Sequence, residues 1–159
     1  MTEKTSMYRK PGPFMRRFTN PVLGAAVRLG VSVWGSRVLE VRGRKSGTVR
    51  RTPVNLLSYE GREYLVSPRG DTQWARNVRA DNGRLVLMLG RRRDERAVTE
   101  LTDDEKPPVL RAYLRRWKLE VGMFFEGVGP GSSDQELLRI ASKHPVFLLD
   151  KGNSDNSRL

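Results

Sequence analysis

The chain has 159 residues and a hydrophobic fraction of 37%, which suits one domain with one compact core. It contains no cysteine and a single histidine, His144, which excludes disulfides, a thiolate nucleophile and the usual zinc and iron–sulfur sites. Thirty lysines and arginines against 18 acidic residues give a net charge of +12, which indicates an anionic partner. A phosphorylated small molecule, a nucleic acid and an acidic membrane surface all satisfy that charge.

The two ends of the chain are predicted to lack fixed structure. Residues 1–13 are polar and contain two prolines, and residues 151–159 are polar and follow the last apolar run. One domain over residues 14–150 is expected between them. No signal peptide or membrane span is recognised, because Arg28 and several glycines interrupt the apolar stretch after Pro21, so a cytoplasmic location is expected.

A basic amphipathic helix is predicted near the N-terminus. Asn20 and Pro21 have the form of an N-cap and a first helical position, and apolar residues continue to Leu29. Arg16 and Arg17 precede it. We expect this helix to cover one end of the core, and peripheral contact with an anionic bilayer is the alternative.

The chain then changes to strand periodicity. Strands are expected over Val38–Arg42, Val49–Ser58 and Arg62–Ser67, with a hairpin turn at Glu60-Gly61. Pro53 predicts an edge or a bulge in the second strand, because proline cannot donate a ladder hydrogen bond.

A helix and further strands follow. Asp71 is the expected N-cap of a helix over residues 72–80. Asn82-Gly83 is the expected turn into a strand over residues 84–89, and Gly90 to Arg93 would turn the chain into a strand near residues 96–101.

The last third of the chain is predicted to be mainly helical. Capping boxes at Thr102/Glu105 and Ser133/Glu136 would open two helices, and Val146–Leu149 would form the last strand. About six strands with few helices and no regular alternation favour an antiparallel barrel with covering helices, not a Rossmann sheet.

The densest chemical signal is the turn from Gly43 to Arg51. Two glycines bracket Lys45-Ser46, so the backbone can bend tightly while Arg44, Lys45 and Arg50 converge from both arms. The glycine spacing is not that of a Walker A loop. The turn suits a polyanion, although a charged hairpin is often only a solvated edge.

A second cluster runs from Ser67 to Asn77, where a strand enters a helix. Trp74 and Asn77 lie three residues apart and so share one helical face, where an indole can cover a ring while the amide makes a directional hydrogen bond. Taken alone, a core tryptophan and a local cap are the simpler interpretation.

Together, GRKSG, the following Arg50 and Thr52-Pro53, Ser67 and the WxxN of Trp74 and Asn77 resemble the nitroreductase family of deazaflavin-dependent oxidoreductases. The resemblance covers roughly residues 38–101. It implies a mainly β fold with some α, a split β-barrel similar to flavin-reductase and PNP-oxidase barrels. It also implies coenzyme F420 as cofactor and hydride transfer to a quinone, a nitroaromatic or another conjugated acceptor. We expect the protein to be a monomer or a homodimer.

The resemblance assigns cofactor-binding roles to ten residues. The phosphate and glutamate tail would be held by Arg44, Lys45 and Arg50, and the turn would be shaped by Ser46 and Gly47. The pocket would be lined or closed by Pro53, Ser67, Arg69, Trp74 and Asn77, with Ser67 near the ring. The chain departs from the family pattern at Asn55, where known members carry tyrosine, and at Pro68-Arg69-Gly70, where they carry Lys-Gly-Gly.

The acceptor side is less defined by the sequence. Four apolar residues can either line an acceptor pocket or form core: Trp117, Met123, Phe124 and Phe125. No proton donor is assigned, and the candidates are water, Tyr113 and a backbone group. An FMN-binding split barrel and a non-enzymatic cofactor carrier are the alternatives. A nucleic-acid binder is disfavoured, because no recognition motif appears and Arg91-Arg92-Arg93 is interpreted as a solvated hairpin tip.

Overall fold

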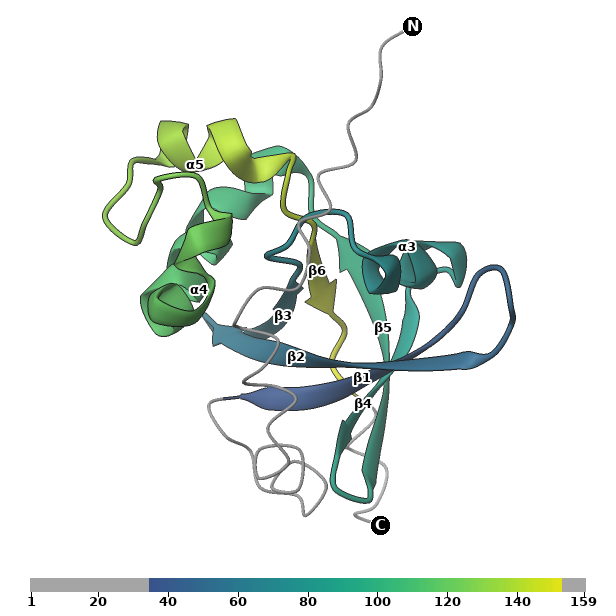
Figure 1. Ribbon diagram of the computed structural model, residues 1–159. Helices are drawn as coiled ribbons and strands as arrows, with labels where there is room; N and C mark the ends of the chain where they lie inside the picture. Colours follow the sequence, from purple (N-terminus) through teal and green to yellow (C-terminus); the bar gives the residue numbers. More distant parts are fainter. Residues whose placement is uncertain (1–34, 153–159) are drawn as a thin grey trace, which may run out of the picture.

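The computed structural model describes residues 35–152, and the predicted N-terminal helix and nearly all of both predicted flexible ends lie outside them. Six antiparallel strands close into a barrel in the order β1-β2-β3-β6-β5-β4 (Figure 1). The predicted barrel with covering helices is confirmed. The strands are β1 Ser36–Arg42, β2 Val49–Tyr59, β3 Arg62–Val66, β4 Arg84–Leu89, β5 Arg92–Glu100 and β6 Val146–Leu149.

Strand β2 is shared between two partners, and this explains its proline. Residues 49–55 pair with β1, from Arg42 opposite Val49 to Ser36 opposite Asn55, whereas residues 56–59 pair with β3. Pro53 therefore lies in the half of β2 that has one strand partner within the described residues, as the sequence predicts for an edge. At the β2–β3 turn, Glu60 and Gly61 have φ of 48° and 73°, the conformation of a tight hairpin turn.

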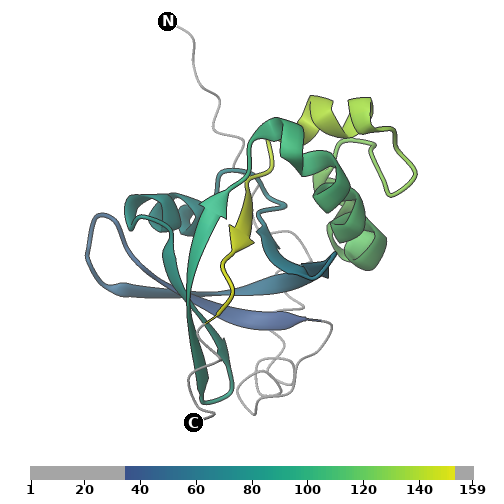
Figure 2. The ribbon, with the colours of Figure 1, turned by 180° about the vertical axis from the view of Figure 1, so that it is seen from behind.

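The helices occupy two places around the barrel. Helix α3 Gln73–Ala80 lies on one side, near the β1–β2 turn (Figure 1). The others lie together at the opposite side, as the reverse view also shows (Figure 2). They are α4 Lys106–Val121, α5 Asp134–Ala141 and the short 3-10 turns η1 Asp103–Glu105 and η2 Gly122–Phe124. Among the described residues, no helix is long and apolar enough to span a bilayer.

Both predicted capping boxes are present. Ser133 Oγ accepts a hydrogen bond from the Glu136 backbone N–H, and the Glu136 carboxylate accepts one from the Ser133 N–H, each at 3.2 Å. The same reciprocal pair links Thr102 and Glu105.

Two local predictions were wrong. The N-cap of α3 is Thr72, whereas Asp71 forms ion pairs with Arg76 and Arg79, because cations on the helix surface attract its carboxylate. Strand β5 begins at Arg92, not near residue 96, so the β4–β5 turn is confined to Gly90 and Arg91, although residues 91–93 are exposed as expected of a hairpin tip. Arg93 donates to Glu40 of β1 at 2.6 Å, a contact that links the start of β5 to β1.

The described residues form two buried apolar clusters. One fills the barrel, and the other lies under α4 and α5 and contains Trp117, Phe124 and Phe125. These three side chains therefore belong to the core, whereas Met123 is 56% exposed.

Candidate functional site

The turn between β1 and β2 is built by short-range hydrogen bonds. The Gly43 N–H donates to Thr48 O and the Gly47 N–H donates to Gly43 O, both at 2.8 Å. Gly47 has φ of +70°, which favours glycine, and a Cβ on Gly43 would lie 2.7 Å from Ser46 Oγ. Ser46 Oγ also accepts from the Thr48 N–H at 3.2 Å, so its side chain bonds within the turn.

The turn is tied to α3 by Arg44. Its Nη1 donates to Gln73 Oε1 at 2.9 Å and to Asn77 Oδ1 at 2.8 Å, and its backbone N–H donates to the same Asn77 oxygen at 3.2 Å. Both acceptors are neutral amides, so the guanidinium is held in place while its charge stays uncompensated.

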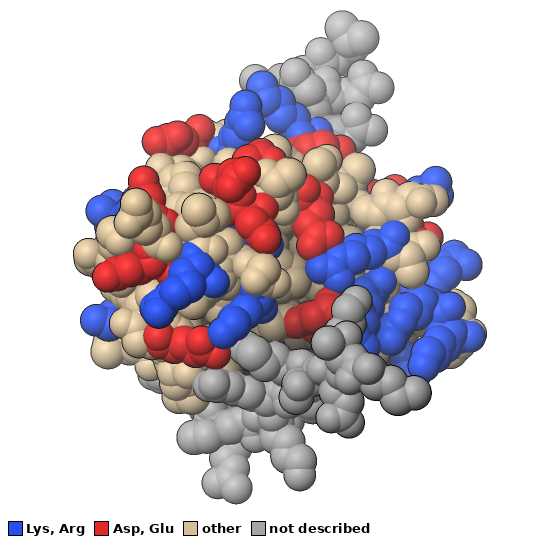
Figure 3. All heavy atoms as spheres, turned by 90° about the horizontal axis from the view of Figure 1, so that it is seen from above, with Lys and Arg blue, Asp and Glu red and all other residues tan. Residues whose placement is uncertain are grey.

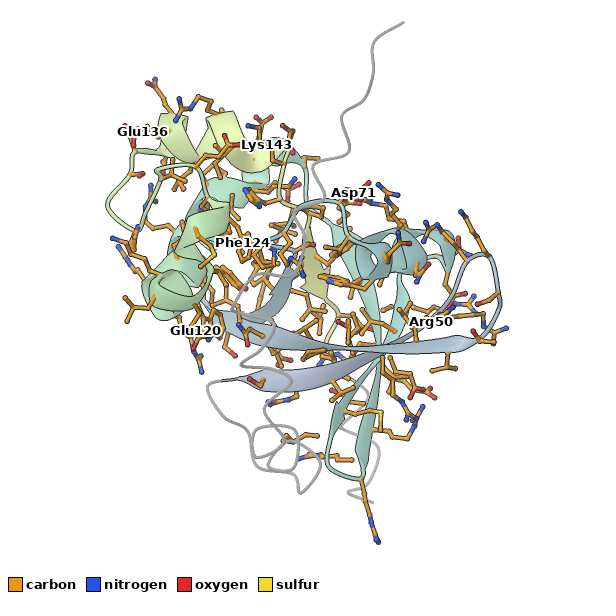
Figure 4. All side chains as sticks on the ribbon, in the orientation of Figure 1. Arg50, Asp71, Glu120, Phe124, Glu136 and Lys143 are labelled. Atoms are coloured by element: carbon orange, nitrogen blue, oxygen red, sulfur yellow. The ribbon has the colours of Figure 1, made fainter. Side chains whose placement is uncertain are left out.

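Between the turn, β2 and α3 lies a cavity of about 400 Å³, here called the turn cavity. It is lined by Val41, Gly43, Arg44, Lys45, Ser46, Arg50, Thr52, Gln73, Trp74 and Asn77. Three of these residues are cations and none is acidic. Figure 3 shows lysines and arginines gathered on the side of the molecule where α3 and this turn lie, and Figure 4 shows Arg50 on β2 near the turn.

Six of the ten predicted site residues line this cavity: Arg44, Lys45, Ser46, Arg50, Trp74 and Asn77. Gly47 belongs to the turn but does not line the cavity. Sequence reasoning missed Thr52 and Gln73, although both follow from periodicity. Thr52 lies two residues after Arg50 on the same face of a strand, and Gln73 lies four residues before Asn77 on the same face of a helix.

Pro53, Ser67 and Arg69 are not among the lining residues. The side chain of Pro53 points to the other face of β2 from Thr52. Ser67 is fully buried, and its Oγ donates to Gly70 O at 2.6 Å and lies 3.0 Å from Thr72 Oγ1, so it holds the loop that leads into α3. The guanidinium of Arg69 lies 5.9 Å from the ring of Phe124, which Figure 4 shows on the α4 side of the barrel.

Trp74 supplies an apolar wall beside the cations. Its ring centroid is 5.7 Å from that of Phe147 in β6, so the indole rests on the barrel core while part of it remains accessible. A cationic turn next to an aromatic wall suits a ligand with an anionic tail and a flat head.

The model of the F420H(2)-dependent quinone reductase family matches residues 14–120. The chain belongs to this family. It is therefore an F420-dependent oxidoreductase, and the cofactor and activity predicted from the motifs are confirmed at that level. A comparison with curated proteins gives no match.

Solved structures are similar to this family member in fold. A structure described as a domain-swapped dimer shares 20% identity over 87% of this chain and 98% of its own, with a TM-score of 0.52. A protein of unknown function from Agrobacterium tumefaciens shares 15% identity over 85% of this chain and 56% of its own, with a TM-score of 0.54. A NimC/NimA family protein from Clostridium acetobutylicum shares 14% identity over 87% and 88%, with a TM-score of 0.50.

The turn cavity fits the cofactor of the F420-dependent family. A phosphodiester followed by carboxylates needs several cations and no nearby acid, and the lining provides that combination. Lys45 and Arg50 are exposed and make no ion pair within residues 35–152, so their charges are available to a ligand.

This family member has a second and larger cavity, of about 920 Å³, here called the paired-charge cavity. It is lined by Arg37, Leu56, Glu63, Leu87, Leu89, Arg92, Arg93, Asp94, Glu95, Arg96, Asp150, Lys151 and Gly152. Arg96, whose side chain is 5% exposed, contacts Glu63 at 3.0 Å and Asp94 at 3.1 Å, and Asp150 at 3.2 Å. Three of the four carboxylates in the lining therefore pair with Arg96.

Two other titratable groups lie in the core. Burial raises the pKa of Tyr113 well above its usual range, and a contact with Asn55 opposes that shift only in part. Burial lowers the pKa of His144 to about 4. Its ring stacks on Phe125 with centroids 4.2 Å apart. The backbone of Ser67 and Pro68 lies near enough to favour the protonated ring, but neither ring nitrogen makes a well-formed hydrogen bond.

Proposed function

We propose that this protein passes a hydride from reduced F420 to a quinone and that the turn cavity holds the anionic tail of the cofactor. The observation that carries the proposal is the charge of the cavity: three cations, no carboxylate, and an arginine anchored only by neutral amides. Phosphate and carboxylate oxygens bind such groups through charge-assisted hydrogen bonds.

The three cations differ in their freedom. Arg44 has one guanidinium nitrogen fixed on α3 and can present the remaining edge to a phosphate in a defined direction. Lys45 and Arg50 are exposed on the two arms of the turn, so they can adjust to carboxylates of the tail. We assign Arg44 to the phosphate and the other two to the tail beyond it.

The head of the cofactor is proposed to lie towards Trp74. F420H2 supplies the hydride when bound, so the chain needs no nucleophile of its own. What the protein supplies is binding, orientation and a partly dry wall, to which Trp74 and Val41 contribute. Tyr113 is not proposed as proton donor, because it is buried in the core with its ring 4.9 Å from Trp117. Water or a backbone group remains the proposed source.

A quinone is the acceptor class that the family implies, and nitroaromatic or other conjugated acceptors are a wider proposal. The cytoplasmic location, the choice between monomer and homodimer, and contact of the N-terminal segment with a membrane stay predictions. The last would be measured by co-sedimentation with anionic and neutral vesicles.

The test of the proposed function is a comparison of cofactors on the same protein. F420, FMN and the deazaflavin that lacks the phosphate and glutamates are titrated separately and followed by fluorescence, and F420H2 oxidation is then measured with quinone and nitro acceptors. We expect F420 to bind most tightly and a quinone to be reduced. Tighter binding of FMN, or no F420H2 oxidation with any quinone, would overturn the proposal.

A further inference from the structure

Asn77 combines burial with an unusual set of hydrogen bonds to a residue 33 positions away. It is 5% exposed, and its single side-chain oxygen accepts both the backbone N–H and the Nη1 of Arg44. The amide therefore fixes the path of the turn and the direction of the guanidinium at the same time.

We infer that Asn77 is a positioning residue for the anion site, acting through Arg44 rather than by contact with the cofactor ring. The inference rests on the proposed function, because it supposes that Arg44 meets the cofactor tail. It revises the expectation that Asn77 closes directly on the cofactor.

The arrangement has a physical advantage for binding an anion. An arginine held by a carboxylate has its charge compensated, as Arg96 shows in the paired-charge cavity. An arginine with no partner must lose side-chain entropy when the ligand binds. Neutral amide oxygens avoid both costs, because they restrict the side chain before binding and leave its positive charge in place.

Gln73 supplies a weaker version of the same support. Its Oε1 accepts only Nη1 of Arg44, and its side chain is exposed, one helical turn before Asn77. It reaches the guanidinium but not the backbone of the turn. We therefore expect Gln73 to orient Arg44 without fixing the turn, which makes Gln73→Ala a graded companion to changes at Asn77.

The main test is a double-mutant cycle with two ligands. Asn77→Ala is expected to weaken binding of F420 about tenfold, Gln73→Ala two- to threefold, and neither is expected to change binding of the tail-less deazaflavin. In an Arg44→Ala background, Asn77→Ala should have no further effect. A loss of tail-less binding would place Asn77 on the cofactor ring, and a full tenfold effect without Arg44 would show that Asn77 contacts the cofactor itself; either result would overturn the inference.

Asn77→Asp separates position from charge. The carboxylate keeps an acceptor for both Arg44 groups but compensates the cation, so F420 affinity should fall while the Arg44 amide remains protected from hydrogen exchange. Asn77→Ala should remove that protection, and this readout needs no cofactor.

The two readouts separate this inference from the proposed function. If wild type fails to bind F420 but the exchange results hold, the proposed function fails and the positioning of Arg44 stands. If protection is unchanged in Asn77→Ala, the positioning role is wrong. Gln73→Ala alters an exposed side chain, so it stays informative if the Asn77 variants do not fold.

Discussion

The turn cavity and the paired-charge cavity both carry charged side chains, but they differ in the balance between positive and negative charge. The turn cavity has three cations and no acid in its lining, whereas the paired-charge cavity has five cations and four acids. The lining of the larger cavity therefore carries a net excess of one cation, whereas that of the smaller cavity carries an excess of three. Volume alone would have selected the paired-charge cavity.

The ion pairs explain the difference physically. Arg96 is almost fully buried, and a buried guanidinium needs carboxylates to offset its lost hydration. Lys45 and Arg50 remain in contact with water, so they need no partner in the free protein. We interpret the first arrangement as stabilising the barrel and the second as reserved for binding.

Removing the free cations tests this contrast most strongly. Lys45→Ala combined with Arg50→Ala is expected to weaken F420 binding about a hundredfold, because two charge-assisted hydrogen bonds are lost. The control is Arg92→Ala with Lys151→Ala, which removes equal charge from the paired-charge cavity and should change affinity less than threefold. Fluorescence titration measures both, and equal effects of the two pairs would break the comparison.

The buried arginine should behave in the opposite way. Arg96→Met keeps the apolar stem but leaves three carboxylates without their cation, and we expect a loss of about 2 to 3 kcal/mol in the free energy of unfolding. The expected loss is smaller than for a fully buried pair, because the acidic side chains are 37%, 46% and 51% exposed. Urea denaturation measures the loss, and F420 affinity should stay within twofold of wild type. A stable variant with weakened cofactor binding would reverse the assignment of the two cavities.

His144 differs from both the exposed cations and the ion-paired Arg96, because it is a buried group that stays neutral at pH 7. Its folded pKa of about 4 lies below the ordinary value of 6.5, so the unfolded chain binds more protons between these values. Stability is therefore fully present above pH 6.5 and is lost as the pH falls towards 4, by about 2 kcal/mol between pH 7 and pH 5.

Because His144 is the single histidine, one substitution tests its contribution to the pH dependence of the unfolding free energy. His144→Phe keeps an aromatic ring against Phe125 and should flatten the dependence of unfolding free energy on pH over this range. An equally steep dependence in the variant would assign the effect to other groups.

Salt should produce the smallest effect. Raising sodium chloride from 0.05 to 0.5 M is expected to weaken F420 binding about fivefold, because the exposed cations of the turn are screened. The tail-less deazaflavin should show almost no change over the same range. Matching salt dependence for the two ligands would mean that the tail does not meet free charge.

Local patterns made much of the fold predictable. Strand periodicity located all six strands, and the Ser133/Glu136 spacing located α5, because these signals depend on near neighbours in sequence. The start of β5 at Arg92 was not predicted, because charged residues on both faces of the strand leave no alternation of apolar and polar residues there. The cap of α3 shifted by one residue, since Asp71 found cations that no local rule anticipates.

The site was predictable only in part, for a different reason. Turn chemistry placed Arg44, Lys45 and Arg50 together, and helical spacing placed Trp74 with Asn77. The bond between Arg44 and Asn77 joins residues 33 apart, which only the closed barrel brings together. Ser67 is held both by its own loop, through Gly70 O, and by a distant segment, because its backbone N–H donates to Pro145 O.

A crystal structure of the protein with F420 bound tests the central claim most directly. The account predicts the phosphate of the cofactor within hydrogen-bonding distance of the Arg44 guanidinium, the glutamates beside Lys45 and Arg50, and the deazaflavin ring towards Trp74. A tail lying in the paired-charge cavity, or a bound cofactor that leaves the 43–48 turn without contact, would contradict it.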